Sequence, residues 1–235
     1  MADKPKSAEM HPGPGFRIRR NIERPTQEII QKFREFETPD VSDLMNRLYT
    51  MCADIRNMVN SSPLVGPACT VKVYPGDNMM VHKALDIAQP GDIVVVDTGG
   101  SYTNAVLGDL VANKAKHREI AGFVIDGLVR DIPGLMEVGI PVYARGATPI
   151  GPLHRGPGEL NHSISCGGIV VNPGDIITAD SNGVVVVRKD FSEELLERLY
   201  QQKASLEDYI ADVKAGNFSN AWVDNYLKNV GCLED

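Results

Sequence analysis

The sequence has few of the residues that build zinc sites or disulfide frameworks. Only four of its 235 residues are cysteine, and no two of them form a C-x-x-C pair. No histidine cluster stands near a cysteine, so a structural zinc site is not predicted. Dispersed single cysteines are typical of a protein with reduced thiols, and the four positions are Cys52, Cys69, Cys166 and Cys232.

An excess of positive charge is also lacking. The chain has 24 Lys and Arg against 31 Asp and Glu, which leaves a net charge of −7. A general nucleic-acid binder needs a basic surface to meet the phosphates, so no nucleic-acid partner is expected. A small anionic substrate needs only local positive charge and stays compatible with this balance.

Long hydrophobic runs are missing too. No apolar run reaches the length that crosses a bilayer, so no membrane association is expected. The first residues, MADKPKSAEMHPGPG, are polar and lack the apolar centre of a signal peptide. These features together predict a cytoplasmic location.

The pattern along the chain predicts a single α/β domain. Residues 1–25 begin with several Pro and Gly and almost no apolar residues, which favours a flexible arm. Residues 26–215 carry alternating helical and strand patterns, and residues 216–235 form a C-terminal segment. The domain is predicted to start with a helical cap and to end with a long polar helix at 191–215.

Two helices are predicted before the sheet. The first covers 26–36 with Thr26 as its N-cap, and the second starts where Thr38 caps and Pro39 fits the first helical position. The inner stripe of the second helix is expected to be Val41, Leu44, Met45 and Leu48.

Several strands follow from apolar patterns. The stretch 68–74 alternates, with Val71 and Val73 opposite Thr70 and Lys72, which predicts a half-buried strand. The run IVVVD at 93–97 is continuously apolar and predicts a strand buried on both faces. Three short strands with PGD and SNG turns between them are expected at 168–171, 175–179 and 183–188.

The most informative stretch runs from Leu107 to Ile132. Gly108-Asp109 opens a helix that reaches about Glu119, the strand AGFVID follows, and Arg130-Asp131 lies just past that strand. Twenty residues lie between Asp109 and Arg130, which is about one helix, one turn and one strand. The chain therefore returns and brings both carboxylates to one edge of the sheet, where α/β proteins bind ligands.

Each of these charged residues has two possible roles. Asp131 suits a magnesium ligand, because Mg²⁺ uses one or two carboxylates, but it could also cap a helix at Pro133. Arg130 suits a carboxylate clamp, or else an ion pair with Asp126 or Asp109. Asp109 could also act by stabilising a helix N-terminus. Lys72 could form a Schiff base, but its predicted place toward solvent makes this a poor interpretation.

The spacing from Asp109 to Arg130-Asp131 resembles the signature of the RraA-like family. Three phrases resemble it as well, over roughly Thr38 to Lys189: PGDIVVVD (90–97), VIDGLVRD (124–131) and CGGIVVNPGDIITADSNGVVVV (166–187). The resemblance implies a mixed central sheet of the swivelling-domain type and a homotrimer or homohexamer. The enzymatic branch of the family contains divalent-metal pyruvate aldolases that cleave 4-hydroxy-4-methyl-2-oxoglutarate and 4-carboxy-4-hydroxy-2-oxoadipate.

The resemblance also implies a role for each site residue. Arg130 would contact the pyruvyl part of the substrate, Asp131 would be the direct ligand of Mg²⁺ or Mn²⁺, and Asp109 would orient metal-bound water. Backbone amides at the helix N-terminus would bind the substrate carboxylate, and they belong to Gly108, Leu110 and Val111.

One part of the family pattern is not matched. The aldolases complete their site with a Glu from the C-terminal helix of an adjacent subunit, near a Gly-Glu-Leu sequence. Here the comparable stretch, residues 215–218, reads AGNF, and Glu207 is the carboxylate near that place. The segment 216–235 carries Trp222, Tyr226 and Leu227, an apolar face predicted to pack on a neighbouring subunit.

The predicted function is a metal-dependent carbon–carbon lyase. It would act on a small 2-oxo acid through a pyruvate enolate, as a pyruvate aldolase, an oxaloacetate decarboxylase or both. The alternative is a non-catalytic regulator that binds an RNA-degrading enzyme, because regulators in this family share much of the motif. The long C-terminal helix and tail favour the enzyme, since short regulators lack them.

Overall fold

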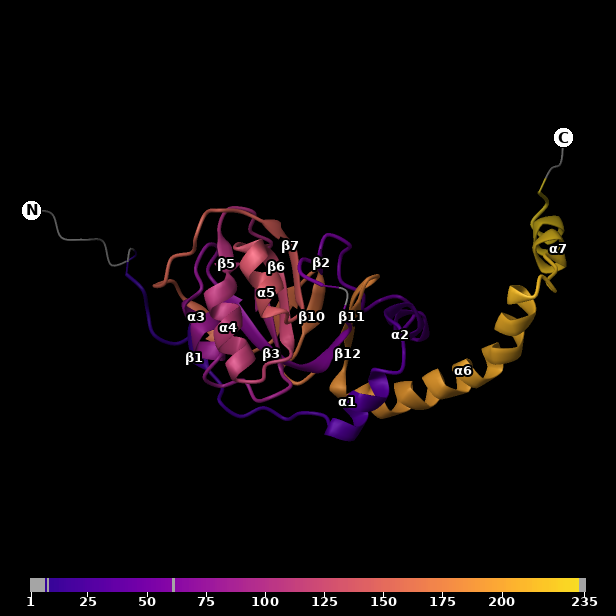
Figure 1. Ribbon diagram of the computed structural model, residues 1–235, viewed down its shortest axis with the longest axis horizontal. Coiled ribbons are helices and arrows are strands. Elements are labelled where there is room, and N and C mark those ends of the chain that lie inside the picture. The colour runs from indigo at the N-terminus through magenta and orange to yellow at the C-terminus, as the bar shows by residue number, and fades with distance from the viewer. Residues whose placement is uncertain (1–6, 8, 61, 233–235) are drawn as a thin grey trace, which may run out of the picture. The chain divides into compact units, whose positions relative to one another are not determined.

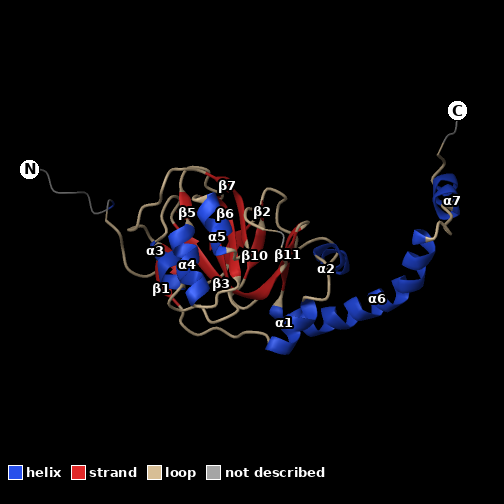
Figure 2. Ribbon diagram, in the orientation of Figure 1, coloured by secondary structure: helices blue, strands red, loops and turns tan. Residues whose placement is uncertain are grey.

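The structure is a computed structural model that describes residues 7, 9–60 and 62–232. Figures 1 and 2 show a mixed β-sheet with three helices on one face. These helices are α3 (Met79–Ala84), α4 (Asp109–His117) and α5 (Ile132–Val138). The predicted α/β domain with a mixed central sheet and a long C-terminal helix is confirmed.

Four parallel strands form the middle of the sheet, in the order β3 (Leu64–Val73), β4 (Ile93–Asp97), β6 (Gly122–Val129) and β7 (Val142–Ala147). All five residues of β4 are buried, as the run IVVVD predicts. Antiparallel pairs on either side make the sheet mixed. Its other strands are β1 (Phe16–Ile18), β2 (Arg56–Asn57), β5 (Ala105–Leu107), β8 (Gly158–Leu160), β11 (Ile176–Asp180) and β12 (Gly183–Val187).

The three helices bury their apolar stripes against the strands. Val81 of α3, Ala112 of α4 and Leu135 of α5 share one core cluster with Val96 and Ile125 of the sheet. Full burial of a side chain such as Val or Leu contributes about 1.5–3 kcal/mol relative to exposure. This packing fixes α4 and α5, the two helices that carry the predicted site.

The opposite face of the parallel strands packs against the hairpin of β9 (Ile164–Cys166) and β10 (Ile169–Val171). It also packs against the β11–β12 pair, which continues the sheet from β3. Thr70 is therefore fully buried, and its hydroxyl donates to the carbonyl of His162 at 2.6 Å. The prediction of a half-buried strand at 68–74 is wrong for this reason. The alternation itself is right, since Val71 faces the helices and Lys72 is exposed.

The N-terminal helices are α1 (Gln27–Phe33) and α2 (Thr38–Leu44). The hydroxyl of Thr26 accepts from the amide of Ile29 at 3.3 Å, as predicted for an N-cap. Thr38 does not cap α2, because its amide and hydroxyl both donate to Asp180, at 2.8 and 2.7 Å. Leu48, predicted on the inner stripe, lies beyond the end of α2 and is 69% exposed.

The chain divides into two compact units, Met1–Leu196 and Glu197–Asp235. The second unit holds most of α6 (Ser192–Lys214) and all of α7 (Ala221–Asn229). α6 lies in the helix predicted at 191–215, and α7 lies in the C-terminal segment, for which no helix was predicted. Both helices leave large apolar side chains exposed, among them Ile210, Trp222 and Tyr226. Of the arm predicted at 1–25, residues 1–6 and 8 lie outside the described part of the chain.

Candidate active site

The ends of β5 and β6 bring the predicted residues to one edge of the sheet. The two strands are parallel, and the amide of Arg130 donates to the carbonyl of Leu107 at 2.9 Å. α4 begins just after β5, α5 begins just after β6, and the two helices pack side by side (Figure 1). Asp109 and Arg130-Asp131 thus lie at the carboxyl ends of adjacent strands, where α/β sheets place ligand sites.

Asp131 has an unusual backbone conformation. Its φ of 58° and ψ of 42° are left-handed, which costs a non-glycine residue roughly 1–2 kcal/mol. Asp131 occupies the N-cap position of α5, but its side chain caps no amide, so the helix-cap alternative is wrong. Strained residues of this kind gather at ligand sites. The carboxylate is 41% exposed and lies over Gly108. If residue 108 carried a side chain, its Cβ would lie only 2.3 Å from Oδ2 of Asp131, so only glycine leaves room for the carboxylate here.

Arg130 pairs with its neighbour in the chain. Its Nε lies 3.2 Å from Oδ2 of Asp131, and both side chains are 41% exposed. Asp126, one of the two partners considered for a structural ion pair, binds Arg145 instead. An exposed pair between adjacent residues adds little to stability. The guanidinium can therefore exchange this partner for a ligand at small cost.

The carboxylate of Asp109 is held at the start of α4. Its Oδ1 accepts from the amide of Leu110 at 2.7 Å, and its charge is favourable at a helix N-terminus. A Cβ on Gly134 of α5 would lie 2.7 Å from Oδ2 of Asp109. The glycine thus lets α5 approach this carboxylate closely.

The predicted backbone donors lie at this helix start. Gly108 is the N-cap of α4 with an extended backbone, and the first amides of any helix have no acceptor inside it. Leu110 gives its amide to Asp109, while its side chain is 71% exposed. Val111 buries its side chain in the core beneath. Glu207 belongs to the second unit and is on α6, so its part in the site stays a prediction.

The donor set can be compared with the needs of a metal ion. In the described part of the chain, no three His, Cys, Asp or Glu side chains gather into a cage. Asp131 and Asp109 offer two carboxylates at one edge. Mg²⁺ is commonly held by one or two carboxylates and takes its other oxygens from water and substrate. The residues present fit Mg²⁺ or Mn²⁺ held by Asp131, with Asp109 acting through water, better than they fit zinc.

Other charged groups on the sheet have structural partners. Lys72, Asp97 and Asp126 stand in register on three neighbouring strands. The ammonium of Lys72 lies 2.7 Å from Asp97, which is buried, and Asp126 binds Arg145. These pairs neutralise carboxylates inside the fold, so Lys72 serves Asp97 rather than a Schiff base.

Two of the cysteines are unsuited to nucleophilic chemistry. Burial raises the pKa of the Cys69 thiol to about 12 and that of the Cys166 thiol well above its ordinary range. A thiol reacts as its thiolate, and these two side chains stay protonated at neutral pH.

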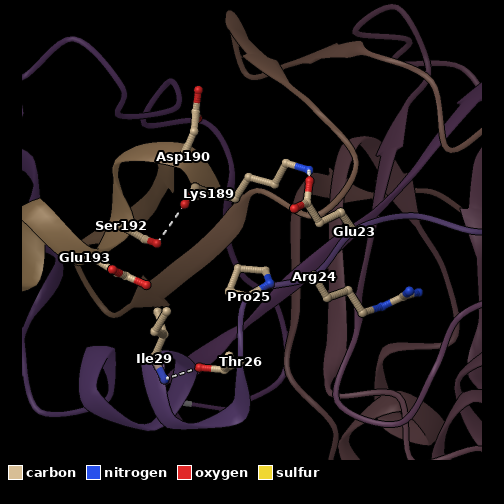
Figure 3. A pocket seen from close by; sticks show the side chains of 9 residues that line it. All are labelled: Glu23, Arg24, Pro25, Thr26, Ile29, Lys189, Asp190, Ser192 and Glu193. Carbon is tan, nitrogen blue, oxygen red and sulfur yellow. Dashed lines mark hydrogen bonds and ion pairs between the residues drawn. The ribbon is translucent and has the colours of Figure 1, made fainter.

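A separate cavity of about 410 Å³ lies where the segment before α1 meets the start of α6 (Figure 3). Both of its cationic side chains are paired: Lys189 lies 2.6 Å from Glu23, and Arg24 binds Asp92 at 2.7 Å. None of the predicted site residues lines the cavity, and we interpret it as a gap left where two segments of the chain pack together. Its lining is Glu23, Arg24, Pro25, Thr26, Ile29, Lys189, Asp190, Ser192 and Glu193.

Fold and site together define a class: a mixed α/β protein with one arginine and two carboxylates at the helix-flanked edge of its sheet. Such a set suits an anionic ligand and a hard cation. The chain belongs to the RraA-like family, described as Aldolase/RraA, whose family model matches residues 38–186. No helix in the described ranges is both long and apolar enough to cross a membrane.

The relatives include proteins named as aldolases and proteins named as RraA. A Halalkalibacterium halodurans protein named "Putative 4-hydroxy-4-methyl-2-oxoglutarate aldolase" is 39% identical over 180 residues, 77% of this chain and 86% of that protein. Streptomyces coelicolor RraAS2, described as an unusual member of the RNase ES inhibitor RraA protein family, has a TM-score of 0.74 at 26% identity, covering 80% of this chain and 98% of its own. RraA from Thermus thermophilis, described as an RNA-processing inhibitor, has a TM-score of 0.60 at 32% identity. The match covers 65% of this chain and 92% of that chain.

Proposed function

We propose that this chain is a carbon–carbon lyase that acts on a 2-oxo acid with a pyruvate moiety. The reaction would be aldol cleavage, oxaloacetate decarboxylation or both, with Mg²⁺ or Mn²⁺ held by Asp131. One observation carries the proposal: the Arg130 guanidinium and the Asp131 carboxylate lie 3.2 Å apart beside the N-terminus of α4. The aldolase name of the Halalkalibacterium halodurans relative supports it.

Each side chain would have a defined task in this reaction. A divalent ion at Asp131 would supply a Lewis acid for the keto group. Arg130 would bind a carboxylate through its planar fork and share the negative charge of the enolate. Asp109 would orient a water molecule that carries protons. In oxaloacetate, the electron pair of the broken carbon–carbon bond would pass to the enolate as CO₂ leaves. A proton from water would then complete pyruvate.

Aldol cleavage would use the same groups with one more proton transfer. The hydroxyl proton of 4-hydroxy-4-methyl-2-oxoglutarate would pass to the water held by Asp109 as the carbon–carbon bond breaks. The bond pair would form the pyruvate enolate beside Arg130, and the second product would leave as pyruvate. Protonation of the enolate carbon would then yield the other pyruvate.

Oxaloacetate decay on chelator-treated protein tests the proposal directly. We expect little decay without metal and a large increase when Mg²⁺ is added back, because the metal supplies the Lewis acid. Since free Mg²⁺ also acts on oxaloacetate, the control is the same Mg²⁺ solution without protein. Pyruvate formation from 4-hydroxy-4-methyl-2-oxoglutarate is measured in parallel. Rates equal to the protein-free control on both substrates would refute a lyase.

A second candidate is a regulator that binds an RNA-degrading enzyme. It is favoured by the likeness to RraAS2, which covers 98% of that chain at a TM-score of 0.74. The regulator would need no metal and no Arg130 clamp. Absence of turnover on both substrates, with binding of the chain to a ribonuclease, would favour it over the lyase.

We further propose a homotrimer or homohexamer in which the C-terminal segment contacts a neighbouring subunit. Phe218, Trp222 and Tyr226 are each more than 60% exposed in this unit, and exposed apolar side chains gathered on one segment commonly mark an interface.

Truncation after Ala215 is expected to shift the oligomer to species with fewer subunits in light scattering, because it removes these apolar side chains. A full-length variant with Trp222→Ser and Tyr226→Ser should give the same shift through the loss of apolar contact alone. An unchanged number of subunits per particle in both proteins would show that the segment does not hold the assembly.

A further inference from the structure

The side chain of Arg130 runs between two glycines that come from different parts of the chain. Gly108 lies just before α4, and Gly151 lies in the loop after β7. A Cβ on Gly108 would lie 3.3 Å from Cγ of Arg130, and a Cβ on Gly151 would lie 2.5 Å from Nη1. The second distance is too short for any real side chain. The present position of the guanidinium therefore requires a glycine at 151.

The backbone does not explain this glycine. Gly151 is not among the glycines with positive φ, so alanine could adopt its conformation. A Cβ at this position would instead meet Nη1 and Cζ of Arg130, at 2.5 and 3.4 Å. The need for a glycine thus comes from the guanidinium itself.

Gly151 is held in place from the other side by Asn104. The amide nitrogen of the Asn104 side chain donates to the carbonyl of Gly151 at 2.7 Å, and Ala105 donates to the carbonyl of Ile150 at 2.8 Å. Asn104 is seated against Gly76, where a Cβ would lie 2.8 Å from its Oδ1. The loop is thereby fastened to the start of β5, the strand that leads to Gly108 and the rest of the site.

We infer that Gly151 and Asn104 are positioning residues for the substrate clamp. Because Gly151 has no Cβ, the guanidinium can lie with Nη1 over residue 151 and Nε beside Asp131, while Asn104 holds the loop that carries Gly151 through a hydrogen bond. The inference rests on the proposed function in giving Arg130 the substrate carboxylate. Its structural part, that residue 151 sets the position of the guanidinium, can be tested without any activity.

Gly151→Ala should move the guanidinium by roughly 1 Å, from 2.5 Å to the 3.4 Å of ordinary contact. A misplacement of that size in an active site can cost about 10²-fold in rate. We therefore expect kcat/KM on oxaloacetate to fall by about 10²-fold at an unchanged melting temperature. The matched control is Gly146→Ala, whose Cβ would meet Leu128 at an ordinary 3.5 Å and should leave turnover unaltered.

Asn104→Ala gives a second route to the same effect if Gly151→Ala does not fold. It removes the bond to the Gly151 carbonyl and should lower kcat/KM in the same direction. In an Arg130→Ala background, neither substitution should lower kcat/KM any further, because the guanidinium that they position is gone. An undiminished cost in that background would overturn the inference, since a merely structural defect would persist there.

Crystal structures of the wild type and of Gly151→Ala separate this inference from the proposed function. A displaced guanidinium with an otherwise unchanged backbone is the expected result. A guanidinium in the same place in both crystals would overturn the positioning role, whatever the activity. A wild type without lyase activity would refute the proposed function, and the two crystal structures would still decide the role of Gly151.

Discussion

Asp131→Ala and Asp131→Asn are both expected to abolish metal-stimulated turnover of oxaloacetate. Asp131 is the carboxylate that would hold the cation directly, and Mg²⁺ binds hard anionic oxygens. The asparagine variant is the cleaner test, because asparagine tolerates the left-handed backbone, with its φ of 58°, at this position. It should keep the melting temperature of the wild type, whereas alanine can lose some stability through strain.

The matched control for this experiment is Asp43, which is 50% exposed and pairs with Arg47 at 3.0 Å, away from the site. Asp43→Asn should leave turnover and its magnesium dependence unchanged. Calorimetric titration with Mn²⁺ measures binding separately from activity, and we expect it to detect binding to the wild type but not to Asp131→Asn. Normal magnesium-dependent turnover in Asp131→Asn would remove this residue from the site.

Arg130→Ala is expected to lower kcat/KM on oxaloacetate by about 10²–10³-fold, the usual cost of removing one charge-stabilising donor. Arg130→Lys should lie between this variant and the wild type, since it keeps the charge and loses the two-pronged geometry. Both variants should melt at nearly the wild-type temperature. The pair with Asp131 is 41% exposed on each side, and its loss costs little.

A structural role for Arg130 predicts the opposite pattern. Both variants would then melt earlier, alanine more than lysine, and activity would follow the folded fraction. Arg118 is the control: it is 51% exposed and lies 2.9 Å from Asp86, outside the site. Arg118→Ala should leave kcat/KM unaltered. A clear fall in the melting temperature of Arg130→Ala with a proportionate loss of activity would end the clamp hypothesis.

The elements that the sequence predicts well are those with strong local patterns. IVVVD forms the buried strand β4, and the run from Gly122 extends to form β6. Gly139 ends α5 in a left-handed conformation, which glycine adopts readily at the end of a helix. In each case the pattern lies within a few residues, so neighbours along the chain determine the outcome.

Burial and capping were harder to predict, because distant segments decide them. Thr70 alternates with Val71 and looks solvent-facing, but the β9–β10 hairpin, almost a hundred residues later, covers it. Thr38 looks like a helix cap, but Asp180 takes its amide and hydroxyl. A local rule cannot anticipate a partner that only the folded chain supplies.

For the site, the sequence by itself determined which charged groups would meet at one sheet edge. The spacing from Asp109 to Arg130-Asp131 requires one helix and one strand, and parallel strands end at the same edge. Only the tertiary structure decided how those groups are held. Gly134 and Gly151 are far from their partners in the chain, and both approach a charged side chain so closely that a Cβ would overlap it. In a sequence, a glycine needed for close approach cannot be told from a glycine needed for its backbone conformation. Its contact with a distant side chain becomes visible only when the elements pack.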